Sequence, residues 1–270
     1  MTADVSPDQT PAGWSDFAEA YDTWLAPNTR RFALDVADAL HLGPGVRLID
    51  VAAGTGALTL AAARLGADVL ATDFAPGMVD LLRRKVAADE LRVRVEPMDG
   101  QALDVEDGAF DAAASLFGLI FFPDTAAGAR ELHRVLRPGG RAAVTAWGPD
   151  GFAIQTLALQ ALAAVGVEHP IRSTAPAAFR LSDPARLEAL LTDAGFTDVE
   201  VQRVEHRWPV PDPEALFRSI PSWAAPMRPL FARLDEGRLR DGAAAFTELV
   251  RRGSQAAGVR LEALLAIGVR

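Results

Sequence analysis

Apolar and polar residues follow one another along this chain in blocks that predict strands separated by helices. The run Val46–Val51 is short, apolar and β-branched, which is typical of a strand buried on both faces of a sheet. A glycine turn at residues 54–56 and an alanine- and leucine-rich helix follow it. Further strand patterns, separated by helical patterns, occur at 67–72, 91–96, 110–117, 141–146, 199–204 and 260–267. This order predicts an α/β fold built on one mostly parallel sheet.

The ends of the chain and one long connection set the predicted domain boundaries. Residues 1–12 are polar and contain proline, so we expect a disordered tail, and residues 13–42 show a helical pattern with several aromatic residues. The sheet and its helices occupy residues 43–207. About fifty residues, 208–258, separate the last two strands, and loops this long normally carry structure or function. We therefore predict a helical cap there, with residues 259–270 returning as the last strand of the core.

The turn after the first strand has the features of a ligand-binding loop. Asp50 stands near the strand end, and the run Gly54-Thr55-Gly56 lets the backbone approach a ligand closely. A dinucleotide site repeats glycine three positions after the second glycine, where this chain has Thr59. Asp73 ends the second predicted strand, nineteen residues after Gly54, and this spacing places an acidic residue at ribose hydroxyls in nucleotide-binding units. A helix N-cap is the alternative role for Asp73, because Pro76 and a helix follow it.

Two stretches carry a resemblance to a known family. The run Asp50-Val51-Ala52-Ala53-Gly54-Thr55-Gly56 resembles the first motif of class I methyltransferases that use S-adenosylmethionine (SAM), although Ala52 replaces the glycine most common there. The run Leu136-Arg137-Pro138-Gly139-Gly140 resembles the turn that precedes the family's fifth strand. The resemblance covers residues 17–196 and is closest to the ubiquinone/menaquinone methyltransferase-like group. It implies a Rossmann-like, seven-stranded sheet, with residues 13–42 acting as a lid.

The same resemblance implies a set of SAM-binding residues. The glycine turn would face the methionine and ribose part of SAM, Phe74 and Met78 would form a wall against adenine, and Asp99 would accept the adenine amino group. Core packing is the alternative for Met78, and a turn before glycine is the alternative for Asp99. The complete predicted cofactor set is Tyr21, Asp50, Ala52, Gly54, Thr55, Gly56, Asp73, Phe74, Met78, Asp99, Gly100, Gln101 and Leu116.

Apolar residues at the predicted strand ends and in the cap indicate where an acceptor would bind. Open α/β sheets bind ligands at the carboxyl ends of their strands, so Phe117, Phe121 and Trp147 are predicted substrate-wall residues, together with Trp223 and Met227 from the cap. Ordinary core packing is the alternative for each of them.

A general base would help only if the acceptor is a hydroxyl. Strand direction places His41 and His133 away from the ligand edge, whereas His169 follows the fifth strand and His206 ends the sixth. Tyr21 is the only tyrosine, and the resembling enzymes often place such a Tyr-Asp pair near SAM. The candidate catalytic residues are therefore His206, His169 and Tyr21. Leu116, Phe117 and Trp147 stand where metal-dependent relatives carry carboxylates, so no metal is expected.

Composition narrows the classes of function. The chain has 270 residues, a net charge of -9 and no visible basic cluster, which disfavours a nucleic-acid substrate. Zero cysteines exclude disulfides, thiolate nucleophiles and iron–sulfur clusters. The sequence shows no signal peptide and no membrane span, so a cytoplasmic protein is expected, as a monomer or a homodimer.

These observations leave three hypotheses. The first is a SAM-dependent methyltransferase that acts on a small, largely apolar metabolite through a carbon, oxygen or nitrogen acceptor. The second is a SAM-binding protein without catalysis. The third is an NAD(P)-dependent oxidoreductase, against which Thr59 and the Asp99-Gly100 pair argue.

Overall fold

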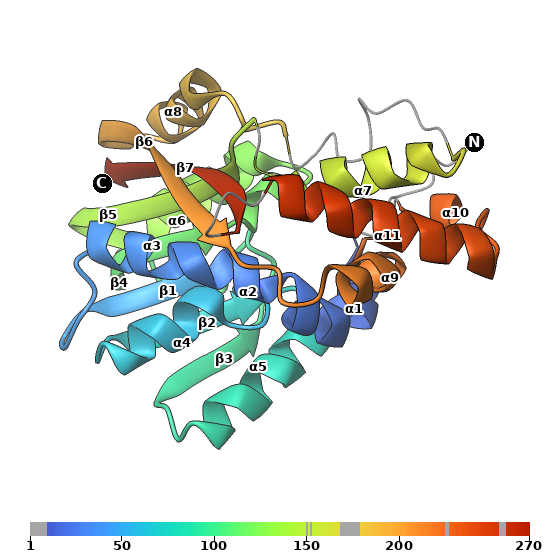
Figure 1. Ribbon diagram of the computed structural model, residues 1–270. Coiled ribbons are helices and arrows are strands. Elements are labelled where there is room, and N and C mark those ends of the chain that lie inside the picture. Colours follow the sequence, from blue (N-terminus) through green and yellow to red (C-terminus); the bar gives the residue numbers. More distant parts are fainter. Residues whose placement is uncertain (1–9, 150, 152, 168–178, 225–226, 254–257) are drawn as a thin grey trace, which may run out of the picture.

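One seven-stranded sheet organises the molecule (Figure 1). The computed structural model describes residues 10–149, 151, 153–167, 179–224, 227–253 and 258–270. The predicted strands are all present, with ends that differ by a few residues from those expected. Their bounds are β1 (Arg47–Val51), β2 (Asp68–Asp73), β3 (Val93–Pro97), β4 (Phe110–Leu116), β5 (Leu136–Trp147), β6 (Thr197–Trp208) and β7 (Val259–Val269).

The strand order is β3-β2-β1-β4-β5-β7-β6. Strands β1 to β5 run parallel to one another, and β7 runs antiparallel to both β5 and β6. The chain changes direction across the sheet between β1 and β4, and ligands of open α/β sheets bind outside the carboxyl ends of the strands at such a point. The predicted α/β class and the Rossmann-like, seven-stranded arrangement are confirmed.

Helices cover both faces of the sheet, and in Figure 1 α3 and α4 lie in front of it while α6 lies behind. Several helices begin where an aspartate caps the first turn. For example, Asp124 Oδ1 accepts from the Ala127 N–H at 2.8 Å, and Asp212 Oδ1 accepts from the Ala215 N–H at 2.9 Å. The bounds are α1 (Pro11–Trp24), α2 (Ala26–Thr29), η2 (Arg30–Phe32), α3 (Ala33–Ala39), α4 (Ala57–Arg64), α5 (Pro76–Ala88), η3 (Leu119–Phe121), α6 (Thr125–Val135), α7 (Ala153–Ala164), α8 (Pro184–Asp193), α9 (Pro213–Trp223), α10 (Arg228–Phe231) and α11 (Glu236–Gly253).

A helical layer lies beyond the carboxyl edge of the parallel strands. The segment 208–258 contributes α9, α10 and α11, and α7 packs with α11. Phe217 holds this layer together, because its ring lies 4.9 Å from that of Phe231 and 5.4 Å from that of Phe246. Helix α9 of this layer also contacts α1. Segments from both ends of the chain therefore meet over one edge of the sheet.

The N-terminal segment is broken into short helices rather than continuous from Trp14 to Leu42. Helix α1 begins at Pro11, where the Thr10 side chain accepts from the Gly13 N–H at 3.1 Å, so this helix begins inside the predicted tail 1–12. Pro27 stands at the start of α2, because its ring fits the first turn of a new helix but interrupts an existing one. The break in the helix before Pro27 lets α1 and α3 take different directions.

The predicted turn Leu136–Gly140 is an irregular first part of β5 and not a separate turn. The pairing of β4 with β5 shifts register at this point. Gly139 has a φ of +76°, which favours glycine, and its N–H donates to the Arg270 carbonyl at 2.8 Å. This segment therefore joins the C-terminal end of β7 at the sheet edge opposite the ligand edge.

No helix within the described ranges is both long and apolar enough to cross a membrane.

Candidate functional site

The loop between β1 and α4 presents backbone to the open edge of the sheet. Ala52, Gly54 and Gly56 all have left-handed φ values, of +57°, +56° and +89°. A Cβ at Gly54 would meet only the Tyr21 ring, at 3.9 Å, so this glycine leaves its outer side open. A Cβ at Gly56 would collide with Leu82 at 2.3 Å, so this glycine serves the packing of α4 on α5. Gly56 does not line the pocket described below, in contrast to its predicted role.

Asp73, at the end of β2, is fixed by the loops on either side of it. Its two carboxylate oxygens accept from the Gly54 and Ala75 N–H groups, each at 2.9 Å. Burial raises the pKa of the Asp73 carboxyl to about 6, although both N–H donors act in the opposite direction. Each oxygen keeps a further lone pair, so the side chain can still accept hydrogen bonds from a ligand.

Asp50 lies beneath the loop and not in the pocket. It is 1% exposed, and its Oδ2 accepts from the Thr59 hydroxyl at 2.6 Å. Thr59 occupies the position where a dinucleotide site has glycine, and here it serves as the donor for the buried carboxyl. Burial raises the pKa of Asp50 to about 7. Asp50 therefore supports the loop from beneath. It does not line the pocket, in contrast to the predicted direct contact with the cofactor.

The loop after β3 forms the next part of the site. Asp99 Oδ1 accepts from the Gln101 N–H at 2.9 Å, and Gln101 Oε1 accepts from the Asp124 N–H at 2.9 Å. Gly100 is buried, and a Cβ there would meet Phe122 and Val51 at 2.7 Å or less. This loop therefore sits tightly between β1 and η3 while the Asp99 carboxylate stays accessible.

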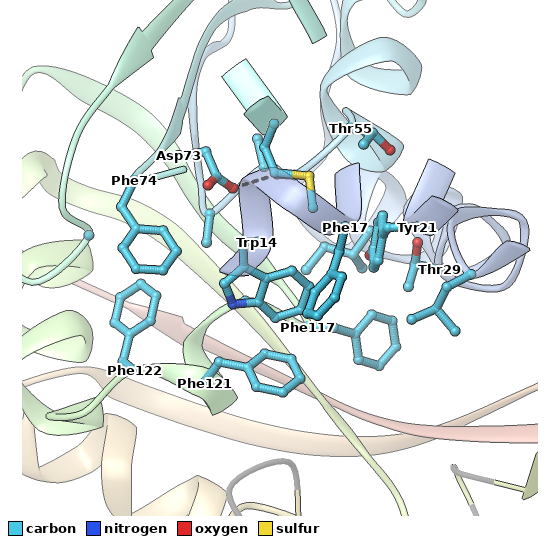
Figure 2. A pocket seen from close by; sticks show the side chains of 18 of the residues that line it. Trp14, Phe17, Tyr21, Thr29, Thr55, Asp73, Phe74, Phe117, Phe121 and Phe122 are labelled. Carbon is cyan, nitrogen blue, oxygen red and sulfur yellow. Dashed lines mark hydrogen bonds between the residues drawn. The ribbon is translucent and has the colours of Figure 1, made fainter. Parts of the chain in front are cut away.

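The three loops converge on one pocket with a cavity volume of about 420 Å³ (Figure 2). Pockets of this size suit small ligands and cofactors. Figure 2 shows Phe74 and Phe122 lying together at one end, next to Asp73, while Tyr21, Thr29 and Phe117 lie at the other. The side chains of Asp73 and Asp99 and the backbone of Gly54 share this pocket, so the structure brings the main predicted residues together.

Aromatic side chains form the second end of the pocket. Phe117 follows β4 with a φ of +59°, which is unusual for a residue with a side chain, and its N–H donates to the Thr145 hydroxyl at 2.8 Å. Its ring stacks on that of Trp147, with 4.0 Å between centroids and 18° between planes. Phe32 packs edge-on against both rings from behind, at 5.3 Å and 6.0 Å. The positive φ of Phe117 thus directs the stacked rings of Phe117 and Trp147 toward the pocket, and these two rings are called the aromatic platform below.

Helix α1 covers the middle of the pocket. The Trp14 ring lies 5.2 Å from Phe121 and 6.0 Å from Tyr21, edge-on in both cases. Burial raises the pKa of the Tyr21 phenol to about 12, in spite of its hydrogen bond with Thr29. Tyr21 therefore keeps its proton at neutral pH and can donate a hydrogen bond.

The histidines do not line this pocket within the described residues. His206 lies behind the aromatic platform, with Nε2 2.6 Å from Asp35 Oδ2 and its ring 4.8 Å from Phe32. It is separated from the pocket because β6 is the outermost strand, beyond β7. His169 lies outside the described residues. His41 is exposed, and His133 packs edge-on against Phe196 at 5.0 Å.

The pocket includes most of the predicted site residues and several that the sequence did not single out. Trp14 and Phe17 share the helical face of Tyr21, so their spacing could have identified them, whereas Thr29 and Gln155 have no such signal. The predicted residues that line it are Tyr21, Ala52, Gly54, Thr55, Asp73, Phe74, Met78, Asp99, Gly100, Gln101, Leu116, Phe117, Phe121, Trp147, Trp223 and Met227. The additional lining residues include Trp14, Phe17, Leu25, Thr29, Met98, Phe122, Gln155 and Ala224.

Comparisons with known proteins agree with this arrangement. A family model described as a methyltransferase domain matches residues 48–140. A demethylmenaquinone methyltransferase of Parafrankia sp. (strain EAN1pec) is 35% identical over 187 residues, which cover 60% of this chain and 74% of the relative. An uncharacterized protein of Mycobacterium tuberculosis H37Rv is 42% identical over 114 residues, or 42% of each chain. The structure of Haemonchus contortus phosphoethanolamine N-methyltransferase 2 with SAM has a TM-score of 0.59 and 16% identity, covering 97% of this chain and 57% of that one.

The chain therefore belongs to the class I SAM-dependent methyltransferases. The match with the three mycobacterial relatives spans 42% of their length. The structural likeness, at low identity, concerns the fold.

Proposed function

We propose that this protein is an enzyme that transfers a methyl group from SAM to a small, largely apolar acceptor. The observation that carries the proposal is the convergence of Gly54, Asp73 and Asp99 on one pocket whose other end is aromatic. Three separate loops of a parallel sheet meet there, as a nucleoside-containing ligand requires. Relatives named as demethylmenaquinone methyltransferases support the same class of reaction.

The residues present fit SAM. The free lone pairs of Asp73 suit ribose hydroxyls, because a carboxylate can accept from two neighbouring hydroxyls. Phe74 and Phe122 supply apolar faces for adenine, and the accessible Asp99 carboxylate supplies an acceptor for its amino group. The open side of Gly54 leaves room for the rest of the ligand. Without these contacts a charged ligand would have little to fix its orientation in an apolar pocket.

SAM, when bound, supplies a methyl group on a sulfonium. An electron pair of the acceptor would form the new bond to this methyl carbon while the carbon–sulfur bond breaks, and its electrons would leave with the sulfur of S-adenosylhomocysteine. Among the described lining residues, the titratable side chains are Tyr21, Asp73 and Asp99. Tyr21 lies at the same end of the pocket as Phe117, and its phenol keeps its proton at neutral pH. Phe117 and Trp147 would therefore contribute by orienting the acceptor and excluding water, which favours a step that neutralises charge. Tyr21, protonated, would act as a hydrogen-bond donor.

The proposal extends to the arrangement of the chain. Residues 13–42 would act as a lid, 208–258 as a cap over the acceptor, and 43–207 with 259–270 as the SAM-binding core. Metal independence, a small-molecule acceptor rather than nucleic acid, a cytoplasmic location and a monomeric or homodimeric state remain predictions of the sequence.

Calorimetric titration with S-adenosylhomocysteine (SAH), followed by turnover assays with SAM and panels of small apolar compounds, tests this function. We expect SAH binding in the wild type and SAH formation with at least one acceptor class, unchanged by a chelator. Binding without turnover on any panel would favour a SAM-binding protein without catalysis. Binding of NAD(P)H in place of SAH would favour the oxidoreductase hypothesis.

A further inference from the structure

Helix α1 has two faces with different partners. Trp14, Phe17 and Tyr21 point into the pocket, while Ser15, Glu19 and Asp22 face α5. The spacing of three or four residues within each set places its members on one side of the helix. The same helix that covers the ligand is therefore fastened to the core along its opposite side.

The fastening begins at the start of α5. The Gly77 N–H donates to the Ser15 hydroxyl at 3.0 Å, and a Cβ at Gly77 would meet the Ser15 backbone at 2.7 Å. Ala18 is buried against Met78 and Leu81 of the same helix. These contacts hold α1 close to the start of α5. Polar side chains further along α1 make its remaining contacts.

Lys85 is the only lysine in a chain that has 27 lysine and arginine residues in all, so the other 26 are arginines. Its Nζ donates to Asp22 Oδ1 of α1 at 2.7 Å and to the Thr55 carbonyl of the glycine loop at 2.8 Å. An ammonium group has three donors that can point to separate acceptors, which suits a bridge between two elements. One side chain on α5 thus holds both the covering helix and the ligand loop.

The bridge is partly withdrawn from solvent, which strengthens it. The side chains of Lys85 and Asp22 are 21% and 23% exposed. Burial tends to raise the pKa of Asp22, but hydrogen bonds with Lys85 and the Thr55 side chain and the charges of Lys85 and Arg30 lower it overall. Arg30 also donates to Asp22 Oδ1, at 2.8 Å. The carboxylate is therefore ionised at neutral pH and shared by two cations.

We propose that Lys85 is a positioning residue that couples closure of α1 to the geometry of the glycine loop. It does not line the pocket, so it acts through Asp22, the residue after Tyr21, and through the Thr55 carbonyl. Tyr21 and Thr55 both line the pocket. A ligand held by the loop would then be covered by α1 as one cooperative unit. This inference rests on the proposed function, because it assumes that SAM or SAH occupies the pocket.

A neighbouring ion pair provides a matched control. Arg84 and Glu19 join the same two helices, but their side chains are 60% and 77% exposed and neither contacts the glycine loop. Exposed pairs contribute little to stability. If replacing Lys85 and replacing Arg84 change ligand binding equally, the change reflects the general contact between α1 and α5. A change seen only when Lys85 is replaced reflects the bridge to the glycine loop.

The binding experiment compares Lys85→Met with Arg84→Met by calorimetric titration with SAH. We expect Lys85→Met to raise the Kd about 10-fold, because hydrogen bonds from a charged group that orient the loop are lost, and Arg84→Met to change it less than about 2-fold. Equal Kd values for Lys85→Met and wild type, or equal losses in the two variants, would overturn the proposal.

Hydrogen exchange of the ligand-free proteins separates this inference from the proposed function. Lys85→Met is expected to speed exchange about 10-fold in both segments 11–24 and 52–58. Asp22→Asn is expected to act more strongly in 11–24 than in 52–58, because Lys85 can still bind the Thr55 carbonyl. The thermal midpoint and exchange in the central strands should stay close to wild type. Faster exchange throughout the sheet would mean a general structural role and refute the bridge. If wild type fails to bind SAH, the proposed function fails, but this exchange pattern still decides whether the bridge exists.

Discussion

The two ends of the pocket are built on different principles. At the end formed by β1, β2 and β3, backbone groups and the Asp73 and Asp99 carboxylates are fixed by short-range hydrogen bonds. At the end formed by β4 and β5, the rings of Phe117 and Trp147 stack and face the cap. The first end can select a ligand by directed hydrogen bonds, and the second selects by shape and by excluding water. One end should therefore control cofactor affinity and the other the acceptor.

The largest expected effect concerns the aromatic end. Phe117→Ala should lower the free energy of unfolding by about 3–4 kcal/mol, because it removes a buried ring. Phe117→Gly should lower it by roughly 1 kcal/mol less, because glycine accepts the left-handed φ without strain. Denaturant unfolding of both variants measures the difference. SAH affinity should stay within about 2-fold of wild type, and a greater loss of stability in the glycine variant would contradict the strain argument.

The next effect concerns the polar end. Asp73→Ala should weaken SAH binding by about 1.5–3 kcal/mol, the usual contribution of hydrogen bonds to a charged group. Asp73→Asn, which keeps one acceptor oxygen, should lose less. Calorimetric titration at pH 7.5 measures both. An affinity equal to wild type in Asp73→Ala would remove the ribose assignment and, with it, the division of the pocket into two ends.

The pH dependence of the free energy of unfolding should also differ between the two ends. The folded state raises the pKa of Asp50 to about 7, so it holds a proton that the unfolded chain releases near pH 4. This contribution to stability is present at low pH and is lost as the pH rises through about 7. Between pH 7.5 and pH 5, wild type should gain about 2 kcal/mol of unfolding free energy relative to Asp50→Asn. Denaturant unfolding at both pH values tests this, and Phe117→Ala should keep the wild-type pH dependence.

The smallest expected effect lies where the two ends meet. Ala52 has a φ of +57°, and a Cβ at Gly118 would lie 2.4 Å from the Ala52 Cβ. Ala52→Gly should stabilise the fold by about 0.5–1 kcal/mol by relieving backbone strain. Gly118→Ala should destabilise it, and the double variant should recover part of that loss because the opposing methyl is gone. Thermal unfolding of the three variants gives the coupling, and strict additivity would show that the two residues do not interact.

The polar end could be predicted from the sequence because each of its features is local. An apolar β-branched run predicts a strand, a glycine pair predicts the turn after it, and an acidic residue about twenty positions later predicts the neighbouring strand end. The positions of Gly54, Asp73 and Asp99 at one edge then follow from the parallel order of the strands. Asp50 and Gly56 were placed at the ligand because the motif does not distinguish residues that face it from residues that support the loop.

The aromatic end depended on contacts that no local pattern encodes. His206 lies near the end of the sixth strand, two residues before Trp208 rather than at the end as predicted. The antiparallel β7 lies between β5 and β6, so this histidine lies outside the pocket beside Asp35. Helices α7 and α11 meet only because the sheet brings their attachment points together.

The sequence by itself determined the class of fold, the presence of the seven strands and the loops that approach a ligand, because hydrophobic period and glycine placement act within a few residues. Only the tertiary structure decided which side chains share the pocket, and it paired the single lysine with Asp22 and the Thr55 carbonyl. Contacts between residues 30 or more positions apart depend on strand order and helix packing, which a one-dimensional pattern does not specify.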